Sequence, residues 1–314
     1  MRNKAITIFG GSGFLGRHLV RRLARLGATL RVPTRHPERA NFLKPLGDVG
    51  QIVLEPWDAA TPGVLERLVG DSTYVVNLIG ILAERRKGDF ETVQGRLPGL
   101  IGTAAREAGA SRMVHVSAIG ADRGSSSVYA RTKAEGEEAA RAALPASVIL
   151  RPSVVFGPED EFFNRFARMA MISPALPLVG GGRTRFQPVY VGDVADAIVA
   201  ALQKDDAAGR TYELGGPKVY TFRELMELTL RFVNRRRALV SLPYGLAALQ
   251  ARILQLLPEP PLTVDQVELL KRDNVVAPGA LTLRDLGVEP TPLEVVVPAY
   301  LQAFAAAPVR LPVV

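Results

Sequence analysis

A glycine-rich turn directly after the first apolar segment is the feature that most constrains the fold of this chain. Residues 5–9 (AITIF) are predicted to form a short buried strand. A G-x-x-G-x-x-G pattern follows, with its glycines at Gly10, Gly13 and Gly16. Glycine allows a tight turn and a close approach of a ligand to the backbone, and a helix that begins there points free N–H groups at phosphates. The pattern therefore predicts a strand–turn–helix unit that binds a dinucleotide.

The first 155 residues continue with an alternation of short apolar runs and amphipathic helical patterns. The runs are rich in Val, Ile and Leu and too short for helices, and they predict strands at 5–9, 29–33, 51–54, 74–78, 112–117 and 147–151. The predicted helices among them are 14–26, 62–69, 90–108 and 129–143. This alternation indicates a parallel sheet with helices on both faces, which binds ligands at the carboxyl ends of its strands. We therefore expect an α/β, doubly wound (Rossmann) fold.

The alternation stops after Arg151, where Pro- and Gly-rich segments follow. Further helices are predicted at 193–203, after Thr221, at 244–257 and at 264–272. We expect Asp193 to cap the first of these helices, and Thr221 to form a capping box with Glu224. The predicted dinucleotide-binding domain is 1–155, completed by about 178–205, and the predicted small, mostly helical C-terminal lobe is 156–177 with 206–314.

The end of the second predicted strand bears on which dinucleotide binds. NAD-binding proteins usually carry an acid about 20 residues after the glycine motif, where it holds the ribose hydroxyls. The stretch LRVPTRHPERA has no acid before Glu38, and Arg35 stands there instead. A guanidinium suits the 2′-phosphate of NADP, although a solvated surface arginine is the alternative. Asp58, after the third strand, either binds the adenine amino group or caps the next helix. We expect NADP(H) rather than NAD(H).

A tyrosine and a lysine lie four residues apart at the start of the predicted helix 129–143. On a helix, Tyr129 and Lys133 share one face. A free tyrosine titrates near pH ~10 and is a poor base at neutrality, but a nearby ammonium lowers its pKa. The pair is therefore either a proton-transfer centre or part of a cofactor-binding site that has lost its chemistry.

These features together resemble the short-chain dehydrogenase/reductase superfamily, in its extended or atypical branch. The matching residues are Gly10–Gly16, Asn77–Gly80, Ser117, Tyr129–Lys133 and the segment RPSVVFG at 151–157. The resemblance implies that the last segment packs on the nicotinamide. The expected cofactor-binding residues are Gly10, Ser12, Gly13, Phe14, Leu15, Gly16, Arg35, His36, Asp58, Leu78, Ile79, Gly80, Tyr129, Lys133, Pro152 and Val154.

The third catalytic group expected beside Tyr129 and Lys133 is Ser117, at the end of the fifth strand. Extended members of the superfamily usually carry their catalytic Ser or Thr one or two residues further on, where this chain has alanine and isoleucine. The serines at 125–127 are the alternative. Without a hydroxyl on the substrate oxygen, stabilisation of the transition state weakens. On the sequence alone, the chain is therefore either an enzyme or a protein that only holds the cofactor.

Three segments narrow the resemblance further: VVNLIGIL, HVSAIGAD and LLPEPPLTVDQVELLKRDNVV at 256–276. They are similar to the NADPH-binding accessory subunits of respiratory complex I and their bacterial relatives. That family implies tightly held NADP(H), a position beside the quinone-side arm of the complex and no established turnover, and related proteins are linked to ubiquinone synthesis.

Two hypotheses follow. The favoured one is an accessory subunit, or an assembly or stability factor, of NADH:quinone oxidoreductase, or else a ubiquinone-linked protein. The other is an active NADP(H)-dependent oxidoreductase or epimerase, with Tyr129 and Lys133 as acid/base pair on a carbonyl or sugar-nucleotide substrate.

Composition argues against several other classes of protein. Cysteine is absent and the three histidines (His18, His36, His115) are scattered, so we expect no metal site. The net charge of +8 is spread along the chain without aromatic interleaving, so we expect no nucleic acid partner. No apolar run reaches about 18 residues, and the N-terminus lacks a signal-peptide pattern, so we expect neither a transmembrane helix nor secretion.

One basic cluster bears on membrane contact. Arg235–Arg237 stand just before the apolar helix predicted at 244–257. The two together either rest on anionic lipid or form a buried helix of the lobe with a solvated charge run. We expect a cytoplasmic protein, whose partners are complex I subunits or the membrane surface near the quinone site, on the cytoplasmic face of the inner membrane.

Overall fold

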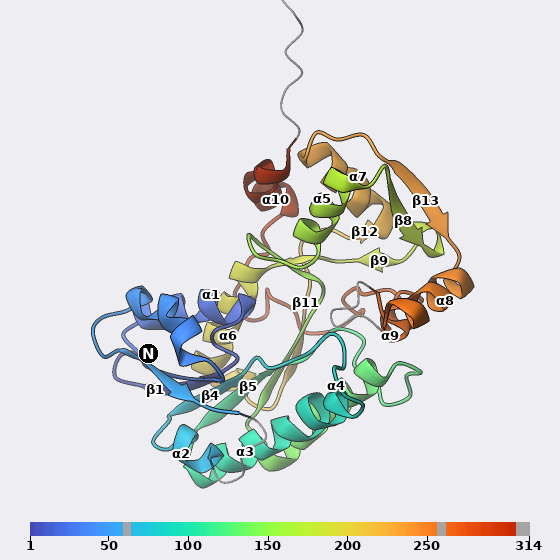
Figure 1. The fold of residues 1–314 in the computed structure, drawn as a ribbon. Helices are drawn as coiled ribbons and strands as arrows, with labels where there is room; N and C mark the ends of the chain where they lie inside the picture. The colour runs from blue at the N-terminus through green and yellow to red at the C-terminus, as the bar shows by residue number, and fades with distance from the viewer. Residues whose placement is uncertain (59–63, 256–261, 306–314) are drawn as a thin grey trace, which may run out of the picture.

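The structure, a computed structural model, describes residues 1–58, 64–255 and 262–305 (Figure 1). Its first half contains β1 (Ala5–Phe9), α1 (Phe14–Arg25), β2 (Thr29–Thr34), η1 (Pro37–Leu46), β3 (Ile52–Pro56), α2 (Leu65–Val69), β4 (Tyr74–Asn77), η2 (Glu91–Arg96), α3 (Leu97–Glu107), β5 (Arg112–Val116), α4 (Val128–Ala143) and β6 (Val148–Pro152). Its second half contains β7 (Val155–Phe156), α5 (Phe163–Ile172), β8 (Ala175–Val179), η3 (Gly180–Gly182), β9 (Arg185–Phe186), β10 (Val189–Tyr190), α6 (Val191–Gln203), η4 (Asp205–Ala207), β11 (Thr211–Leu214), β12 (Tyr220–Thr221), α7 (Phe222–Phe232), β13 (Ala238–Leu242), α8 (Tyr244–Leu254), α9 (Val264–Leu269), α10 (Leu293–Leu301) and η5 (Gln302–Phe304).

A seven-stranded sheet in the order β11-β6-β5-β4-β1-β2-β3 organises the larger part of the molecule. All of its neighbouring strands pair in parallel. The strand order runs outward in both directions from the β1–β4 pair, so the carboxyl ends of these two strands border the crevice where such sheets bind ligands. This arrangement confirms the predicted doubly wound α/β fold.

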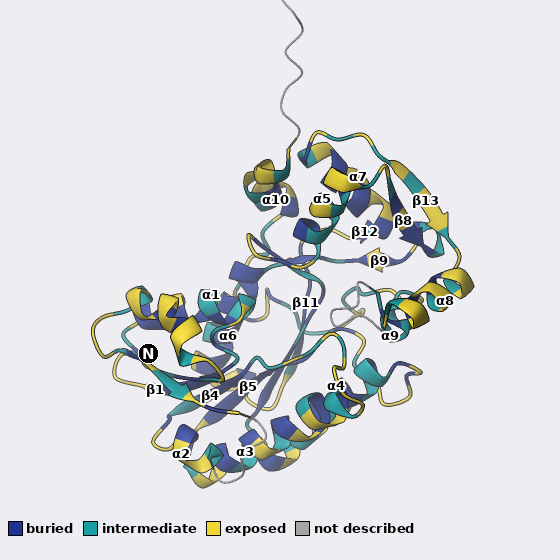
Figure 2. Cartoon of the chain, viewed as in Figure 1, coloured by how far each residue is buried: buried dark blue, intermediate teal, exposed yellow. Residues whose placement is uncertain are grey.

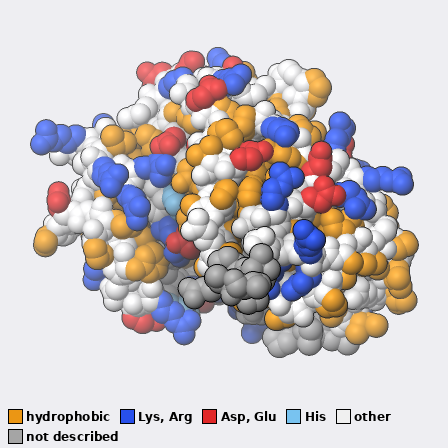
Figure 3. Space-filling view, turned by 90° about the horizontal axis from the view of Figure 1, so that it is seen from above, with side chains coloured by type: hydrophobic (Ala, Val, Ile, Leu, Met, Phe, Trp, Pro, Cys, Tyr) orange, Lys and Arg blue, Asp and Glu red, His pale blue; other side chains and the backbone are white. Residues whose placement is uncertain are grey.

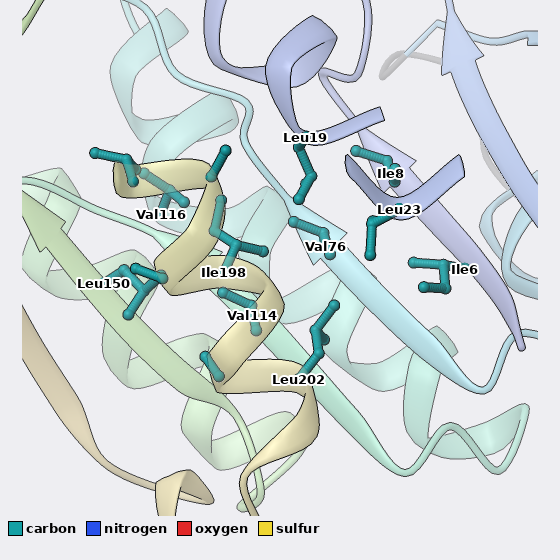
Figure 4. Close-up of a cluster of buried hydrophobic side chains, with 14 of the residues drawn as sticks. Ile6, Ile8, Leu19, Leu23, Val76, Val114, Val116, Leu150, Ile198 and Leu202 are labelled. Atoms are coloured by element: carbon teal, nitrogen blue, oxygen red, sulfur yellow. The ribbon is translucent and has the colours of Figure 1, made fainter. Parts of the chain in front are cut away.

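Helices cover both faces of the sheet. α1 and α6 pack side by side on one face, whereas α2, α3 and α4 lie on the other (Figure 1). The central strands β1, β4, β5 and β6 are almost wholly buried, whereas the edge strand β3 is partly exposed (Figure 2). Side chains of α1 and α6 interlock with those of the strands in the largest apolar cluster, which Figure 4 shows around Leu19, Leu23, Ile198 and Leu202. The pair of helices is further joined by Arg22, which donates two hydrogen bonds to the carboxylate of Asp196.

The predicted elements recur with bounds that differ by a few residues at most, apart from the helix predicted at 90–108. All six predicted strands form, and so do the helices predicted at 14–26, 129–143 and after Thr221. Parts of two predicted helices, 62–63 and 256–257, lie outside the described residues. The helix predicted at 264–272 ends at Leu269. Continuous apolar runs are typical of strands buried on both faces, which explains why these strands could be predicted from the sequence.

The helix predicted at 90–108 is divided into a wide π-helical turn, η2, and the α-helix α3. Pro98 explains the division, because proline has no N–H to give the carbonyl of Gln94 and its ring crowds that oxygen. α4 closes on the same carbonyl at Gly136, where any Cβ would overlap the Gln94 oxygen. The wide turn therefore lets α4 approach closely.

One strand of the sheet was not predicted. The sequence assigned 206–314 to the lobe, but β11 (Thr211–Leu214) pairs with β6 at the sheet edge. The four residues include the charged Glu213, and a charged residue is not typical of a buried strand. In the structure, Arg151 lies 3.5 Å from the carboxylate of Glu213. Arg151 also forms a bidentate contact with Glu137 of α4, at 2.8 and 2.7 Å, so the edge strand is held by a shared ion pair.

The second, smaller part is mostly helical and has its own core. α5, α7 and α10 enclose an apolar cluster with many phenylalanines, and β13 pairs in parallel with β8 beside it. α8 and α9 pack together through Ala247, Ala251 and Val267. The opposite face of α8 exposes Leu246, Leu249 and Ile253, so the interpretation of a buried helix holds for one face only.

The two predicted helix caps had different outcomes. Thr221 and Glu224 form the predicted capping box at the start of α7. The prediction for Asp193 was wrong, because α6 begins at Val191 and this carboxylate lies inside its first turn. It accepts hydrogen bonds from the backbone N–H and the hydroxyl of Thr291, at 2.6 and 2.8 Å, and so ties α6 to the segment before α10.

Surface properties agree with a dispersed charge. Lys and Arg side chains are scattered over the face seen in Figure 3 and do not form one stripe. Across the part of the chain that the structure describes, no helix is long and apolar enough to cross a membrane.

Candidate functional site

The glycine turn lies where β1 ends and α1 begins. Gly10 has a φ of 80°, in the left-handed region that favours glycine, and its carbonyl accepts the N–H of Gly13 at 3.0 Å. A Cβ on Gly16 would lie 2.5 Å from backbone atoms of Gly11, so the helix packs directly on the turn. No side chain caps the first turn of α1, which leaves its N–H groups to a ligand. The predicted Phe14 and Leu15 are half-buried at the start of this helix.

The carboxyl end of β2 lies against the same turn. The hydroxyls of Ser12 and Thr34 are 3.5 Å apart, which brings the glycine turn beside the residues that follow β2. Arg35 and His36 are exposed there, and His36 Nδ1 lies 3.3 Å from the carboxylate of Glu38. Asp58 is exposed just after β3. The residues predicted for the adenosine end therefore follow two neighbouring strands at one edge of the sheet.

The segment after β4 connects the turn to the tyrosine–lysine pair. The backbone N–H of Leu78 donates to Phe9 at 2.9 Å, and that of Ile79 to the side chain of Asn77 at 3.0 Å. A Cβ on Gly80 would lie 3.1 Å from Lys133 Nζ. Residues 78–80 therefore lie between the phosphate turn and Lys133, as expected for a dinucleotide that runs across the strand ends.

Tyr129 and Lys133 share one face of α4, with Lys133 Nζ 5.9 Å from the centre of the Tyr129 ring. The lysine donates to the carbonyl of Val116 at 3.4 Å and is almost wholly buried. Burial lowers the pKa of Lys133 to about 8, opposed by the charge of Glu137. Burial and the nearby Asp265 carboxylate raise the pKa of Tyr129 to about 12. Without a ligand the tyrosine is thus a neutral hydroxyl and not a base.

The hydroxyl expected to complete the catalytic group is enclosed. Ser117 is 4% exposed, and its Oγ is buried without a hydrogen-bond partner among the described residues. The alternative serines have other partners: Ser126 donates to Glu268 at 2.7 Å, and Ser127 caps α4 and donates to Asp265 at 2.7 Å. A substrate would therefore have to displace neighbouring groups to reach a serine here.

The segment after β6 is fixed by backbone hydrogen bonds. Pro152 is buried and accepts the N–H of Ile119 at 3.0 Å, and Val154 accepts that of Val189 at 3.0 Å. Between them, Ser153 donates to the side-chain oxygen of Asn274 at 2.6 Å. These hydrogen bonds fix the conformation of residues 152–154, the segment that the superfamily resemblance implies beside the nicotinamide.

Several polar residues of the site were given no role from the sequence. Asn77 Nδ2 lies 3.2 Å from His115 Nδ1, and burial next to Lys133 lowers the pKa of His115 to about 3, so this ring is neutral. Gln94 comes from the π-helical turn and has an unpartnered buried Oε1 among the described residues. Asp265 and Asn274 arrive from the lobe. The one available signal in the sequence was a polar residue within an apolar strand, which applies to Asn77 in YVVN and to His115 in MVHV.

The arrangement fits a dinucleotide. A bare glycine turn, an uncapped helix N-terminus and a lysine beside Gly80 suit a pyrophosphate and a ribose, whereas the exposed arginine lies at the adenosine end. Among the residues described, no group of three or more His, Cys, Asp or Glu side chains could hold a metal ion.

Comparison with known proteins identifies the class. Residues 6–215 match the NAD dependent epimerase/dehydratase family, and because this is more than half of the chain, the chain belongs to that family. Among solved structures it is similar to the dTDP-glucose 4,6-dehydratase DesIV from Streptomyces venezuelae, with a TM-score of 0.74 and 21% identity over 95% of this chain and 96% of that one. At this identity the likeness shows the fold alone.

Curated relatives narrow the comparison. The chain is 38% identical over 300 residues to "NADH dehydrogenase (ubiquinone) 1 alpha subcomplex subunit 9, mitochondrial" of Arabidopsis thaliana, which covers 92% of this chain and 75% of that protein. It is also 32% identical over 245 residues to the ceramide reductase of Caulobacter vibrioides, with 76% of this chain and 73% of that protein covered. The predicted relationship to the accessory subunits of complex I is confirmed by the first of these.

Proposed function

We propose that this protein is an NADP(H)-binding accessory subunit, or an assembly or stability factor, of a respiratory NADH:quinone oxidoreductase, and that it holds its cofactor without turnover. The observation that carries the proposal is the enclosed hydroxyl of Ser117, which leaves the reacting end of the site without an accessible hydroxyl of the expected kind. The similarity to a named subunit of that enzyme over 92% of this chain supports the same reading.

Each part of the site has a role in holding the cofactor. The glycine turn, with Gly10, Ser12, Gly13, Phe14, Leu15 and Gly16, binds the pyrophosphate at the N-terminus of α1. Arg35 and His36 bind the 2′-phosphate, and Asp58 the adenine amino group. Leu78, Ile79 and Gly80 lie under the sugar phosphates. Tyr129 and Lys133 bind the ribose of the nicotinamide, whose ring rests on Pro152 and Val154. When bound, the reduced cofactor would be able to donate a hydride, and the oxidised cofactor would be able to accept one.

The partner surface is proposed on the lobe. α8 exposes a stripe of Leu246, Leu249 and Ile253, spaced as one face of a helix. The basic residues Arg235–Arg237 precede β13 and α8 in the chain. An exposed apolar stripe suits a partner subunit or a membrane surface, and the arginines lie at the other end of β13, where Arg237 donates to the carbonyl of Ala170 at 2.8 Å. We place the protein peripherally on the cytoplasmic face of the inner membrane, near the quinone site of the complex.

The proposal is tested in gently solubilised membranes separated by native electrophoresis. The chain is expected to migrate with NADH:quinone oxidoreductase activity. A Cβ added at Gly13 would lie 3.3 Å from the carbonyl oxygen of Gly10, and the branched side chain of valine would crowd this oxygen further. Gly13→Val should therefore abolish both cofactor binding and co-migration. Tyr129→Phe keeps the ring and loses one hydrogen bond, so cofactor binding should weaken by about fivefold at most and co-migration should stay unchanged. Migration of the wild-type chain only as a small separate species would contradict the accessory role.

A second candidate function is supported by the similarity to the Caulobacter ceramide reductase and by the Tyr129–Lys133 pair. In this alternative, the protein is an active NADP(H)-dependent oxidoreductase or epimerase acting on a carbonyl or sugar-nucleotide substrate. Tyr129 gives its phenolic proton to the substrate oxygen, Lys133 lowers the pKa of that phenol, and Ser117 orients the substrate after a local rearrangement. Tyr129→Phe then removes turnover but leaves the fold and the bound cofactor, whereas the accessory role predicts that this variant keeps its function.

A further inference from the structure

A polar segment of the lobe crosses the reacting end of the site. This segment, residues 262–276, contains α9 and is called the strap below. It is bound to the larger domain over its whole length through Gln266 to the Leu82 carbonyl, Glu268 to Ser126, Arg272 to Asp122, and Asn274 to Ile119 and Ser153. The strap therefore contacts both the segment that leads into α4 and the segment after β6.

Asp265 is the contact of the strap that reaches Tyr129. Its carboxylate accepts hydrogen bonds from the hydroxyl of Ser127 at 2.7 Å and from the backbone N–H groups of Val128 at 2.8 Å and Tyr129 at 3.3 Å. These backbone groups belong to the first turn of α4, which has no intrahelical partners for them. Ser127 itself caps the N–H of Ala130 at 3.1 Å. The free N–H groups at the start of α4 are thus bound by a residue of the C-terminal lobe.

The geometry points to Asp265 as a positioning residue that fixes the first turn of α4, and with it the place of Tyr129, against the nicotinamide half of the bound cofactor. This inference rests on the proposed cofactor site. A carboxylate at a helix N-terminus is favourable, and three hydrogen bonds to one carboxylate fix the rotation of the turn.

Other contacts around the tyrosine agree with this role. The ring of Tyr129 meets Phe90 edge to face, with 5.9 Å between centroids, so the ring is packed while its backbone N–H is bound by Asp265. The charged groups near it are Lys133 on its own helix and Asp265 on the strap. Burial, together with the Asp265 carboxylate, raises the pKa of Tyr129 and keeps the phenol protonated, in the state that donates a hydrogen bond to a ribose.

The inference predicts an effect on one half of the cofactor only, and two ligands separate the halves. NADPH has both halves, whereas adenosine 2′,5′-bisphosphate has the adenosine half alone. Binding of both is measured on the full chain, by energy transfer from the single tryptophan, Trp57, to NADPH and by displacement for the bisphosphate. The variants are Asp265→Ala and Asp265→Asn, which keeps the volume and one acceptor. Glu268→Gln, on the same helix and in contact with Ser126, is the matched control.

The expected result is that Asp265→Ala weakens NADPH binding about fivefold, as for the loss of a helix cap, while the bisphosphate binds as before. Asp265→Asn should fall between Ala and wild type, and Glu268→Gln should match wild type. Unchanged NADPH binding in Asp265→Ala would overturn the inference. An equal loss for both ligands would overturn it too, because it would indicate general loosening of the fold.

Failure of the proposed function is distinguishable from failure of this inference. If the wild-type chain binds no NADPH, the proposed cofactor role is wrong. Hydrogen exchange still tests Asp265 in that case, because the amides of Val128 and Tyr129 should exchange faster in Asp265→Ala than in Glu268→Gln. Equal exchange in the two variants would contradict the positioning role.

Discussion

One methyl group added at Gly16 would test whether the packing of α1 on the glycine turn sets the shape of the phosphate site. In the interior of a helix, glycine to alanine stabilises by about 1 kcal/mol, because alanine loses less backbone entropy. At Gly16 the new Cβ would lie 2.5 Å from Gly11 backbone atoms, so the turn must move. Overpacking of this kind costs about 1–3 kcal/mol, and the contact with backbone puts Gly16→Ala at the upper end. We expect a net loss of about 1–2 kcal/mol.

The same movement displaces the N–H groups that face the pyrophosphate, so NADPH affinity should fall by more than about tenfold, which corresponds to 1.4 kcal/mol. Unfolding in urea gives the stability change, and energy transfer from Trp57 gives the affinity. Gly245→Ala is the control, since a Cβ there meets nothing within 4 Å and the φ is ordinary. It should stabilise slightly and leave binding unchanged. If Gly16→Ala behaves like Gly245→Ala, the close packing of helix on turn does not shape the site.

Two further predictions concern single charges of the site. Arg35→Ala should weaken NADPH binding by about 10- to 100-fold, since a charge-assisted hydrogen bond contributes about 1.5–3 kcal/mol, and should leave NADH binding unchanged. A parallel loss of NADH binding would contradict a contact with the 2′-phosphate. Lys133 has its pKa lowered by burial from 10.5 to about 8, so in this pH range the unfolded chain holds a proton that the folded chain has lost. The unfolding free energy should therefore rise between pH 8 and 10 by up to about 3 kcal/mol, and Lys133→Met should remove the rise in urea unfolding.

The elements around the phosphate turn were predictable because their causes are local. A strand buried on both faces is a continuous apolar run, and a glycine turn needs a specific spacing, so β1, α1 and Gly10–Gly16 could be read directly. β11 was missed because Glu213 is tolerated there through distant partners: Arg151, 62 residues earlier in the chain, and the backbone N–H of Ala277, which donates to its carboxylate at 2.8 Å. The wide turn at Gln94 could have been suspected from Pro98 four residues later.

Contacts between distant segments set the limit of the sequence analysis. Asp193 was assigned as a helix cap because it precedes a helical pattern. Its actual partner, Thr291, is 98 residues away and could not be inferred from the local sequence. Asp265 had no local signal at all, since a carboxylate in TVDQVEL is ordinary at the start of a helix. Likewise, nothing in VHVSAIG shows whether the hydroxyl of Ser117 faces a ligand or lies enclosed. The residues of the glycine turn could therefore be proposed as a binding site from the sequence, whereas Asp265 and Asn274, which come from the lobe, could not.

The pairing of α1 with α6 has a consequence for how this chain is made. α1 leaves the ribosome early, but the helix that packs beside it on the sheet ends at Gln203. At about 5–20 residues per second, roughly 10–40 s of synthesis separate the two helices. During that time the apolar face of the strands around Val76 and Val114 stays without its cover. A nascent chain of this kind is a natural client for a chaperone that shields hydrophobic surface until the second helix emerges.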